Sequence, residues 1–283
     1  MSVRDLRVAA LIASTLVSLL TAAAVQAEQK PLWEAGLGIG ALRFPDYRGS
    51  DEAQVFPVPV PYFVYRGKFL KADREGVRGE LFNRKYAELS ISANATIPVR
   101  SADNAARRGM RDLKPTVELG PSFDLHVWRS LDERMKLDVV MPLRAPITVE
   151  TSPRSIGVVF APRVNLDIAD VAGYTGWNFG MGAGPIFADD KFHSYFYSVT
   201  PRDVRADRPA YDAGGGYSGA HFIVALSKRF PRYWVGGYIR YDTLAGATFV
   251  DSPLVKQQNY VAGGFGIAWM IGESSRKVET DDE

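Results

Sequence analysis

The 283-residue sequence contains no cysteine and only three histidines, and its formal net charge is +2. Without cysteine, the chain has neither disulfides nor a cysteine near its N-terminus that could carry a lipid. A nearly neutral chain also lacks the basic surface that nucleic-acid binding requires, so we expect no nucleic-acid partner. Beyond residue 30, no apolar run is long enough for a transmembrane helix.

The first 27 residues have the pattern of a cleaved signal peptide. Arg4 and Arg7 form a basic start, and an apolar run over residues 8–20 follows. The run leads into the small-residue stretch TAAAVQA, which predicts cleavage between Ala27 and Glu28. A membrane anchor is the alternative, but the run is short and is interrupted by two serines and a threonine. The rest of the chain is long enough for one large domain.

Apolar and polar residues alternate over most of the remaining sequence. Between Val117 and Val127, apolar side chains or proline occupy the odd positions, whereas Glu118, Asp124 and His126 occupy even ones. No segment of comparable length has the 3.6-residue period of an amphipathic helix. Alternation with a period of two predicts antiparallel β-strands.

These alternating runs are too long for a soluble β-sandwich, whose strands average about five or six residues. They approach the roughly 9–11 residues that a tilted strand needs to cross a bilayer. Aromatic residues gather at the ends of the runs, as in the girdles of membrane barrels: Trp33, Tyr65, Trp128, Trp177, Tyr233, Trp234 and Trp269. Because backbone groups in hydrocarbon must all be paired, such strands have to close. The sequence therefore predicts an all-β fold, a transmembrane antiparallel β-barrel in a bacterial outer membrane.

We expect a barrel over residues 28–271, of about twelve strands, or ten without two short segments, and a polar tail over residues 272–283. The expected strands are 32–43, 54–65, 67–73, 85–98, 115–128, 133–148, 154–169, 173–188, 191–199, 217–230, 232–245 and 259–271. If the last strand ends in the periplasm, 200–216 and 246–258 lie outside. The long basic segment 99–114 then falls on the periplasmic side, where short turns are the rule. Either one strand is miscounted or this loop is unusual.

Signals for a cofactor or for catalysis are weak. GLGIGA, from Gly36 to Ala41, matches a dinucleotide-binding pattern, but the Pro45 that follows prevents the helix that such a site needs. His126 and His221 fall on inward-facing positions without the spacing of a nucleophile. We therefore expect no cofactor, no metal and no enzymatic activity, with an outer-membrane lipid-modifying hydrolase as a remote alternative. Inward charges of both signs predict a closed or nearly closed interior.

The stretch FPDYRGSDEAQVFPVPVPYFVYRGKFL, from Phe44 to Leu70, resembles the start of the MipA/OmpV family, the MltA-interacting proteins. YFYSVTPRD…YDAGGG resembles the tyrosine-rich strand, loop and glycine-rich return of that family, although Thr200 stands where serine is usual. The final strand also lacks the usual terminal aromatic. The residues that match the P-x-Y-x-G-S and D-S-P motifs of the family are Pro45, Tyr47, Gly49, Ser50, Asp251, Ser252 and Pro253.

The resemblance implies a non-enzymatic outer-membrane protein. A named member of the family is a scaffold that links a lytic murein transglycosylase to a bifunctional penicillin-binding protein. The expected partners are therefore these two enzymes, together with outer-membrane lipid. The rival function is a small passive pore or a surface protein.

Residues 55–67, VFPVPVPYFVYRG, place proline at every second position of a strand-forming segment. The N–H groups of alternate residues point toward the same neighbour, so these prolines remove donors from one side only. The segment therefore predicts a strand with one paired and one open edge; the alternative is a polyproline-like periplasmic loop. Because an open edge can bind a partner strand, we hypothesise a docking surface that consists of Pro57, Pro59, Pro61, Tyr62, Tyr65 and Arg66.

Overall fold

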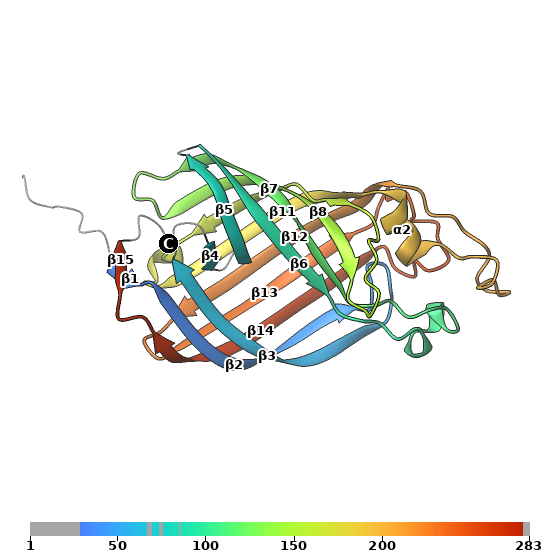
Figure 1. Cartoon of the computed structure of the whole chain (residues 1–283), viewed down its shortest axis with the longest axis horizontal. Coiled ribbons are helices and arrows are strands. Elements are labelled where there is room, and N and C mark those ends of the chain that lie inside the picture. Colours follow the sequence, from blue (N-terminus) through green and yellow to red (C-terminus); the bar gives the residue numbers. More distant parts are fainter. Residues whose placement is uncertain (1–28, 67–69, 74–75, 85, 280–283) are drawn as a thin grey trace, which may run out of the picture.

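The alternating segments form one antiparallel sheet that curls and closes on itself (Figure 1). The computed structural model describes residues 29–66, 70–73, 76–84 and 86–279. The wall of the barrel contains β2 (Trp33–Pro45), β3 (Ala53–Arg66), β4 (Leu70–Asp73), β5 (Gly76–Arg84), β6 (Ala87–Thr96), β7 (Thr116–Arg129), β8 (Met135–Thr148), β9 (Val159–Phe160), β10 (Arg163–Ile168), β11 (Trp177–Ala188), β12 (Gly216–Arg229), β13 (Tyr233–Thr243) and β14 (Asn259–Glu273).

The sheet closes because its two ends pair with one another. Its thirteen strands run in the order β10-β11-β12-β13-β14-β2-β3-β4-β5-β6-β7-β8-β9, and β10 also pairs with β8 while β9 pairs with β11. The short strands β9 and β10 follow one another in the single position between β8 and β11. The barrel therefore has twelve strand positions, and the prediction of twelve strands is confirmed.

Two errors in the predicted strands cancel in this count. The predicted strand 191–199 is wrong, because Asp190–Tyr197 form the helix α2. Asp189 caps this helix: its carboxylate accepts a hydrogen bond from the backbone N–H of Phe192 at 2.9 Å. The missing strand is β5, whose sequence GVRGELFNR is rich in charge and glycine and lacks regular alternation.

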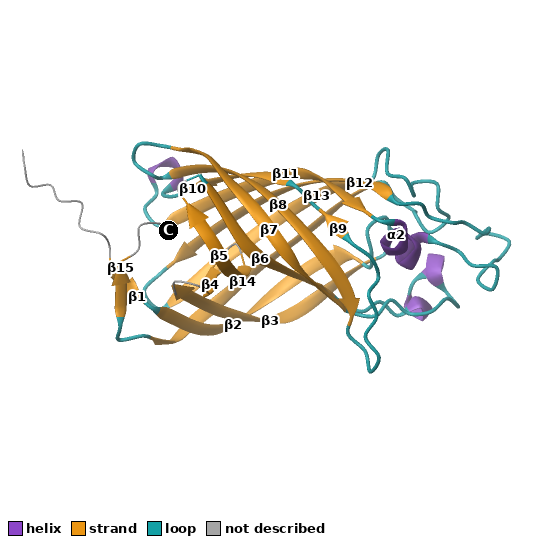
Figure 2. Cartoon of the chain, turned by 45° about the horizontal axis from the view of Figure 1, so that its top comes forward, coloured by secondary structure: helices purple, strands orange, loops and turns teal. Residues whose placement is uncertain are grey.

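With the strands assigned in this way, the basic segment 99–114 lies at the opposite end of the barrel from the one predicted. The segment 97–115, between β6 and β7, lies at the same end of the barrel as α2 (Figure 2). Arg107 of this segment donates a hydrogen bond to the carbonyl of Phe196 at 2.9 Å. The expectation that 99–114 faces the periplasm is therefore wrong. Every long loop that the structure describes lies at this one end.

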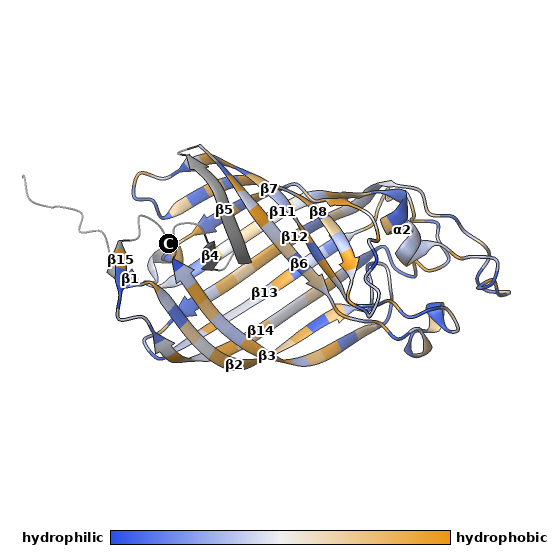
Figure 3. Ribbon diagram, viewed as in Figure 1, coloured by the Kyte–Doolittle hydropathy of each residue, from blue (hydrophilic) through white to orange (hydrophobic). Residues whose placement is uncertain are grey.

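Hydrophilic and hydrophobic residues alternate along the strands (Figure 3), and burial alternates with them, as the predicted barrel requires. On β2, Leu37 and Ile39 point outward and are more than half exposed, whereas Gly36, Gly38 and Gly40 lie on the inner face. Trp33, Trp128 and Trp269 are outward-facing members of the aromatic girdles. Their exposed, apolar surroundings suit the lipid interface.

Trp234 does not belong to a girdle, so its predicted position is wrong. Ile239 and Tyr241 of the same strand face outward. Trp234 lies on the opposite face of the strand, and its ring centroid lies 6.0 Å from that of Tyr62 inside the barrel. Strand parity decides this orientation: Trp234 is an even-numbered residue on a strand whose odd-numbered residues face lipid.

Both ends of the described chain lie at the end opposite the loops. There β1 (Gln29–Pro31) pairs with β15 (Lys277–Glu279), so part of the predicted polar tail forms a small sheet. The described helices are α2 and the single-turn η1 (Ser101–Asp103), η2 (Ala105–Arg107) and η3 (Val171–Gly173). None of the helices in the described residues is long and apolar enough to cross a membrane. Because outer-membrane barrels have long external loops and short periplasmic turns, the end with the termini is the periplasmic end.

This orientation predicts a labelling pattern for single cysteines, which the chain otherwise lacks. Ala102, exposed on η1, should react as Ala102→Cys with a membrane-impermeant maleimide in intact cells. Leu131, on the turn between β7 and β8, should react as Leu131→Cys only after the outer membrane is permeabilised. Labelling of Leu131→Cys alone in intact cells would reverse the orientation.

Closure of the barrel between β2 and β14 depends on Gly38. A Cβ atom at this position would overlap the carbonyl oxygen of Ile267 and the Cα atom of Ala268, which is fully buried. Gly38→Ala should therefore prevent closure, seen as loss of the folded band in a gel-mobility assay with and without heating. Gly214→Ala is the matched control, because no atom lies within 4 Å of its added Cβ. Equal folded fractions for the two variants would contradict the prediction.

Candidate functional site

The loop end of the barrel is covered by a cap with its own apolar core. Leu244, Phe249 and Leu254 are completely buried in it. The residues that form this cap core are Tyr47, Val99, Leu113, Tyr197, Val199, Ala213, Leu244, Ala247, Phe249 and Leu254. They come from loops that are far apart in sequence. This end is therefore closed by packed side chains.

The two sequence motifs meet in this cap. The hydroxyl of Tyr47 donates a hydrogen bond to the carbonyl of Leu254 at 2.7 Å, across 207 residues of sequence. The backbone N–H groups of Lys256 and Gln257 donate to the carbonyl of Gly49 at 2.7 and 3.1 Å. Gly49 has a φ of +95°, a conformation that favours glycine. Direct backbone contacts therefore join the P-x-Y-x-G-S element to the D-S-P loop.

The serines of the two motifs are also buried in the cap. Ser50 is completely buried and its Oγ accepts a hydrogen bond from Asn104 at 3.0 Å. The hydroxyl of Ser252 donates to the carbonyl of Tyr197, at the end of α2, at 2.6 Å. These bonds attach the 97–115 loop and α2 to the motif loops. Of the other motif residues, Pro45 ends β2 and Asp251 is exposed; Pro253 is half-buried.

A buried ion pair lies directly under the cap. Arg48 donates from Nε to Asp242 Oδ1 at 3.2 Å and from Nη1 to the carbonyl of Ser218 at 2.8 Å. Asp242 is completely buried and also accepts a hydrogen bond from Arg240 Nε at 2.6 Å. Burying such charges is costly unless they are paired, so the network ties the motif loop to β13. Sequence reasoning missed Arg48 and Asp242, although charged residues beside membrane strands are a recognisable signal.

The pair His193–Ser218 has the geometry that a nucleophile and a base would need. His193 Nε2 lies 2.5 Å from Ser218 Oγ, and Nδ1 lies 2.7 Å from the carbonyl of Gly214. However, His193 is completely buried and Ser218 nearly so. The imidazole ring packs against Phe249, with centroids 4.6 Å apart. Burial lowers the pKa of His193, which favours the neutral form of the ring. The arrangement therefore ties α2 to β12, and neither side chain is accessible to a substrate.

Several other charged side chains inside the barrel form ion pairs. His126 Nδ1 lies 2.9 Å from Asp138 Oδ1, and Arg129 also contacts that carboxylate, at 2.8 Å. Arg144 pairs with Glu118 at 3.0 Å. No group of three or more histidine, aspartate or glutamate side chains in the described residues is arranged to hold a metal ion. In these two clusters each charged side chain has a partner of opposite charge.

Residues of the predicted docking surface lie at different heights on β3. Arg66, at the periplasmic end, contacts Glu34 at 3.0 Å, and Arg229 contacts the same carboxylate at 2.9 Å. Tyr65 also lies at this end, whereas Tyr62 points into the barrel toward Trp234. That these residues dock a partner stays a prediction.

The proline segment is a strand, so the alternative of a polyproline-like loop is wrong. β3 pairs with β2 along its whole length, from Tyr65 to Ala53. On its other side, among the described residues, only Tyr65 and Arg66 pair, with β4. Pro57, Pro59 and Pro61 all lie in the part with one neighbour. The predicted strand with one open edge is observed.

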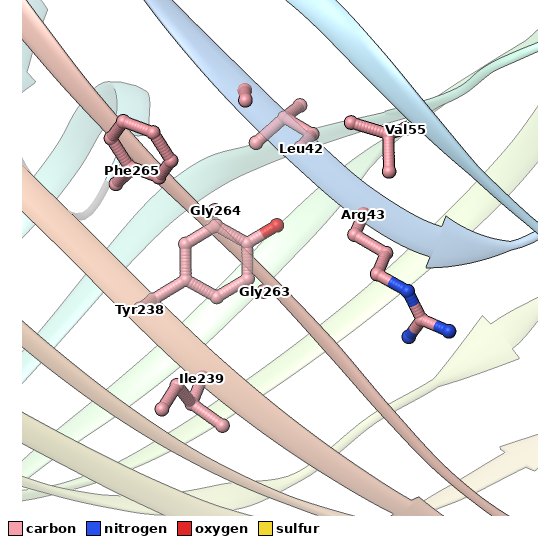
Figure 4. A pocket seen from close by; sticks show the side chains of 9 residues that line it. Leu42, Arg43, Val55, Tyr238, Ile239, Gly263, Gly264 and Phe265 are labelled. Atoms are coloured by element: carbon pink, nitrogen blue, oxygen red, sulfur yellow. The ribbon is translucent and has the colours of Figure 1, made fainter.

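The barrel wall has a shallow apolar hollow of about 340 Å³ beside Gly263 and Gly264 (Figure 4). Val55, Ile239 and Phe265 border it on the lipid-facing side. It has no cluster of polar groups that would orient a ligand. The hollow forms because Gly263 and Gly264 have no side chains to fill this part of the wall.

The motif geometry agrees with a comparison to known families. A family model described as MltA-interacting protein MipA matches residues 37–271. This chain belongs to the MipA family. Outer membrane protein OmpV of Vibrio cholerae is 22% identical over 216 residues, which cover 74% of each chain. Omp26La of Vibrio anguillarum is 22% identical over 218 residues, with the same coverage.

Among solved structures, an outer membrane channel from Pseudomonas putida F1 aligns with a TM-score of 0.43 and 12% identity. The alignment covers 87% of this chain and 98% of the channel. The MipA-family match and the two Vibrio relatives confirm the predicted family and place this protein in the bacterial outer membrane.

The hydrogen bond between Tyr47 and Leu254 predicts how the cap of this MipA-family protein responds when the Tyr47 hydroxyl is removed. Tyr47→Phe keeps the ring but leaves the buried carbonyl of Leu254 without its donor, so cap opening should become easier by about 1–2 kcal/mol. Hydrogen exchange at the amides of Lys256 and Gln257 measures this opening. Tyr211→Phe is the control, because its hydroxyl makes only a 3.4 Å bond at an exposed site. Equal exchange in the two variants would contradict the role of the buried bond.

Proposed function

We propose that this protein is a non-enzymatic scaffold that binds a lytic murein transglycosylase at the periplasmic end of the barrel. The family model describes an interaction with MltA, which is such an enzyme. The loop end is covered by the cap core, which favours an anchoring role over a straight pore. A periplasmic enzyme meets only the opposite end, where the turns lie.

The observation that carries this proposal is a patch of exposed side chains on the periplasmic turns. Leu131 is fully exposed, and Tyr86 and Tyr174 are about two-thirds exposed, at 67% and 68%. We call these three residues the turn patch. The turns of Leu131 and Tyr174 are in contact, because the N–H of Ala169 donates to the carbonyl of Arg134 at 2.7 Å.

Tyr86 lies on the next turn around the rim. Its carbonyl accepts a hydrogen bond from the N–H of His126, near the end of β7, at 3.0 Å. The turn patch therefore spans adjacent turns of one side of the rim. Tyrosine is enriched among the residues that dominate protein interfaces, and the charged Asp132, Glu133 and Arg134 provide a polar border beside it. Such a surface suits a folded protein partner.

Co-purification with an MltA-type transglycosylase tests this scaffold function. The double variant Leu131→Glu/Tyr174→Glu should reduce capture by at least about tenfold, because each side chain places a charge inside the proposed interface. Val204→Glu, at an exposed apolar residue on the loop end, is the control and should bind as the parent does. Both variants are first checked for folding by gel mobility. Unchanged capture by the folded double variant would overturn the proposal.

The second expected partner and the alternative function are tested with the same preparations. In this scaffold the protein links the transglycosylase to a bifunctional penicillin-binding protein, so the two enzymes should be captured together. The proline edge is a separate docking hypothesis, and the triple replacement Pro57→Val/Pro59→Val/Pro61→Val tests it by capture. For the passive pore, planar-bilayer recording should detect no steady conductance, because the cap core fills the loop end.

A further inference from the structure

Between β3 and β6, part of the barrel wall lacks backbone pairing between neighbouring strands in the described residues. The hairpin of β4 and β5 lies between these strands (Figure 2), and its first strand, β4, has 4 residues against 14 in β3. β4 pairs with β3 only at Tyr65 and Arg66. β5 pairs with β6 only as far as Ile91. Among the described residues, 53–64 of β3 and 92–96 of β6 therefore have a strand neighbour on one side only. We call the interval between these two edges the seam.

The prolines prevent the seam from closing as an ordinary sheet. Residues whose N–H and carbonyl face away from β2 alternate along β3, and Pro57, Pro59 and Pro61 occupy three successive positions of this kind. No N–H exists there to donate to a neighbouring strand. Their carbonyls face the seam, where an unpaired carbonyl in hydrocarbon would cost several kcal/mol. The seam therefore presents carbonyl acceptors that need hydrogen-bond donors from another group.

The seam separates two inner surfaces of different chemistry. On the β3 side the inner row consists of Phe56, Val58 and Val60. Phe56 stacks on Phe44 at 5.1 Å, and Val60 fills the space left by the glycines of β2 and β14. This side is apolar and lies directly beside the prolines.

The inner row on the β6 side consists of Ser92, Asn94 and Thr96. Arg144 donates a hydrogen bond to the Oγ of Ser92 at 3.3 Å, and Asn94 donates to Glu118 at 3.1 Å. This side therefore offers hydroxyl, amide and paired charged groups. An apolar row and a polar row face each other across one opening in the backbone pairing.

We propose that the seam is a lateral portal through which a single-chain amphiphile enters the barrel from the surrounding membrane. Its tail packs on Phe56, Val58 and Val60, and its polar head, carrying hydrogen-bond donors, meets the proline carbonyls and the β6 row. The cap core covers the loop end, so the side of the barrel is the direct route between the interior and lipid. This inference is independent of the scaffold function.

Single cysteines report directly on this route, because the chain has none of its own. The full mature chain, reconstituted in vesicles, is exposed to N-dodecylmaleimide, a single-chain amphiphile that dissolves in the bilayer. Val58→Cys lies on the inner row beside the seam. Ile223→Cys, also inward-facing but on β12 on the opposite side of the barrel, is the matched control. Ile39→Cys, two-thirds exposed on the lipid side, gives the full labelling rate.

A lateral portal predicts that Val58→Cys reacts at a rate close to that of Ile39→Cys and at least about tenfold faster than Ile223→Cys. A water-soluble, charged maleimide is used in parallel to show which cysteines water reaches. Equal rates for Val58→Cys and Ile223→Cys with the bilayer-dissolved probe would overturn the proposal. Labelling of Val58→Cys by the water-soluble probe alone would overturn it as well, and would identify the seam as an aqueous path.

Discussion

The requirement that backbone polar groups be paired inside hydrocarbon governs this structure. It forces the alternating strands to close, and closure forces β14 against β2 so tightly that Gly38 has no room for a side chain. The one long interval of the wall without a second strand neighbour, among the described residues, contains three prolines. Proline is the residue that can stand there without leaving an N–H unpaired. The open edge is therefore built into the covalent chain.

The two ends of the barrel have different properties. At the loop end, apolar side chains from distant loops pack into the cap core, and the buried pair of Arg48 and Asp242 ties this core to the wall. At the periplasmic end, short turns leave Leu131 and Tyr174 in solvent. These properties of the two ends agree with the scaffold function that we propose. The buried His193–Ser218 pair joins α2 to β12, and neither side chain is accessible to a substrate.

Local chemistry predicted much of the fold but could not place every strand. Long alternating runs such as Val117–Val127 are unambiguous, because a period of two permits only one face to meet lipid. The segment 191–199 was misassigned because its aromatic residues suit a strand, whereas the cap of Asp189 and the packing of the loops made it a helix. β5 was missed because pairing with its neighbours, rather than its own pattern, makes it a strand.

The sequence by itself determined the outer-membrane location, the barrel fold and the strand that pairs along one edge only. The alternation of apolar residues and the missing N–H groups of proline, on which these conclusions depend, are properties of the chain. It also contained both family motifs. Only the tertiary structure decided that Tyr47 and Leu254 meet across 207 residues. It also decided that Trp234 points inward, and that the proline edge faces a hairpin too short to cover it. These outcomes depend on strand register and loop packing, which are set by contacts between residues far apart in the sequence.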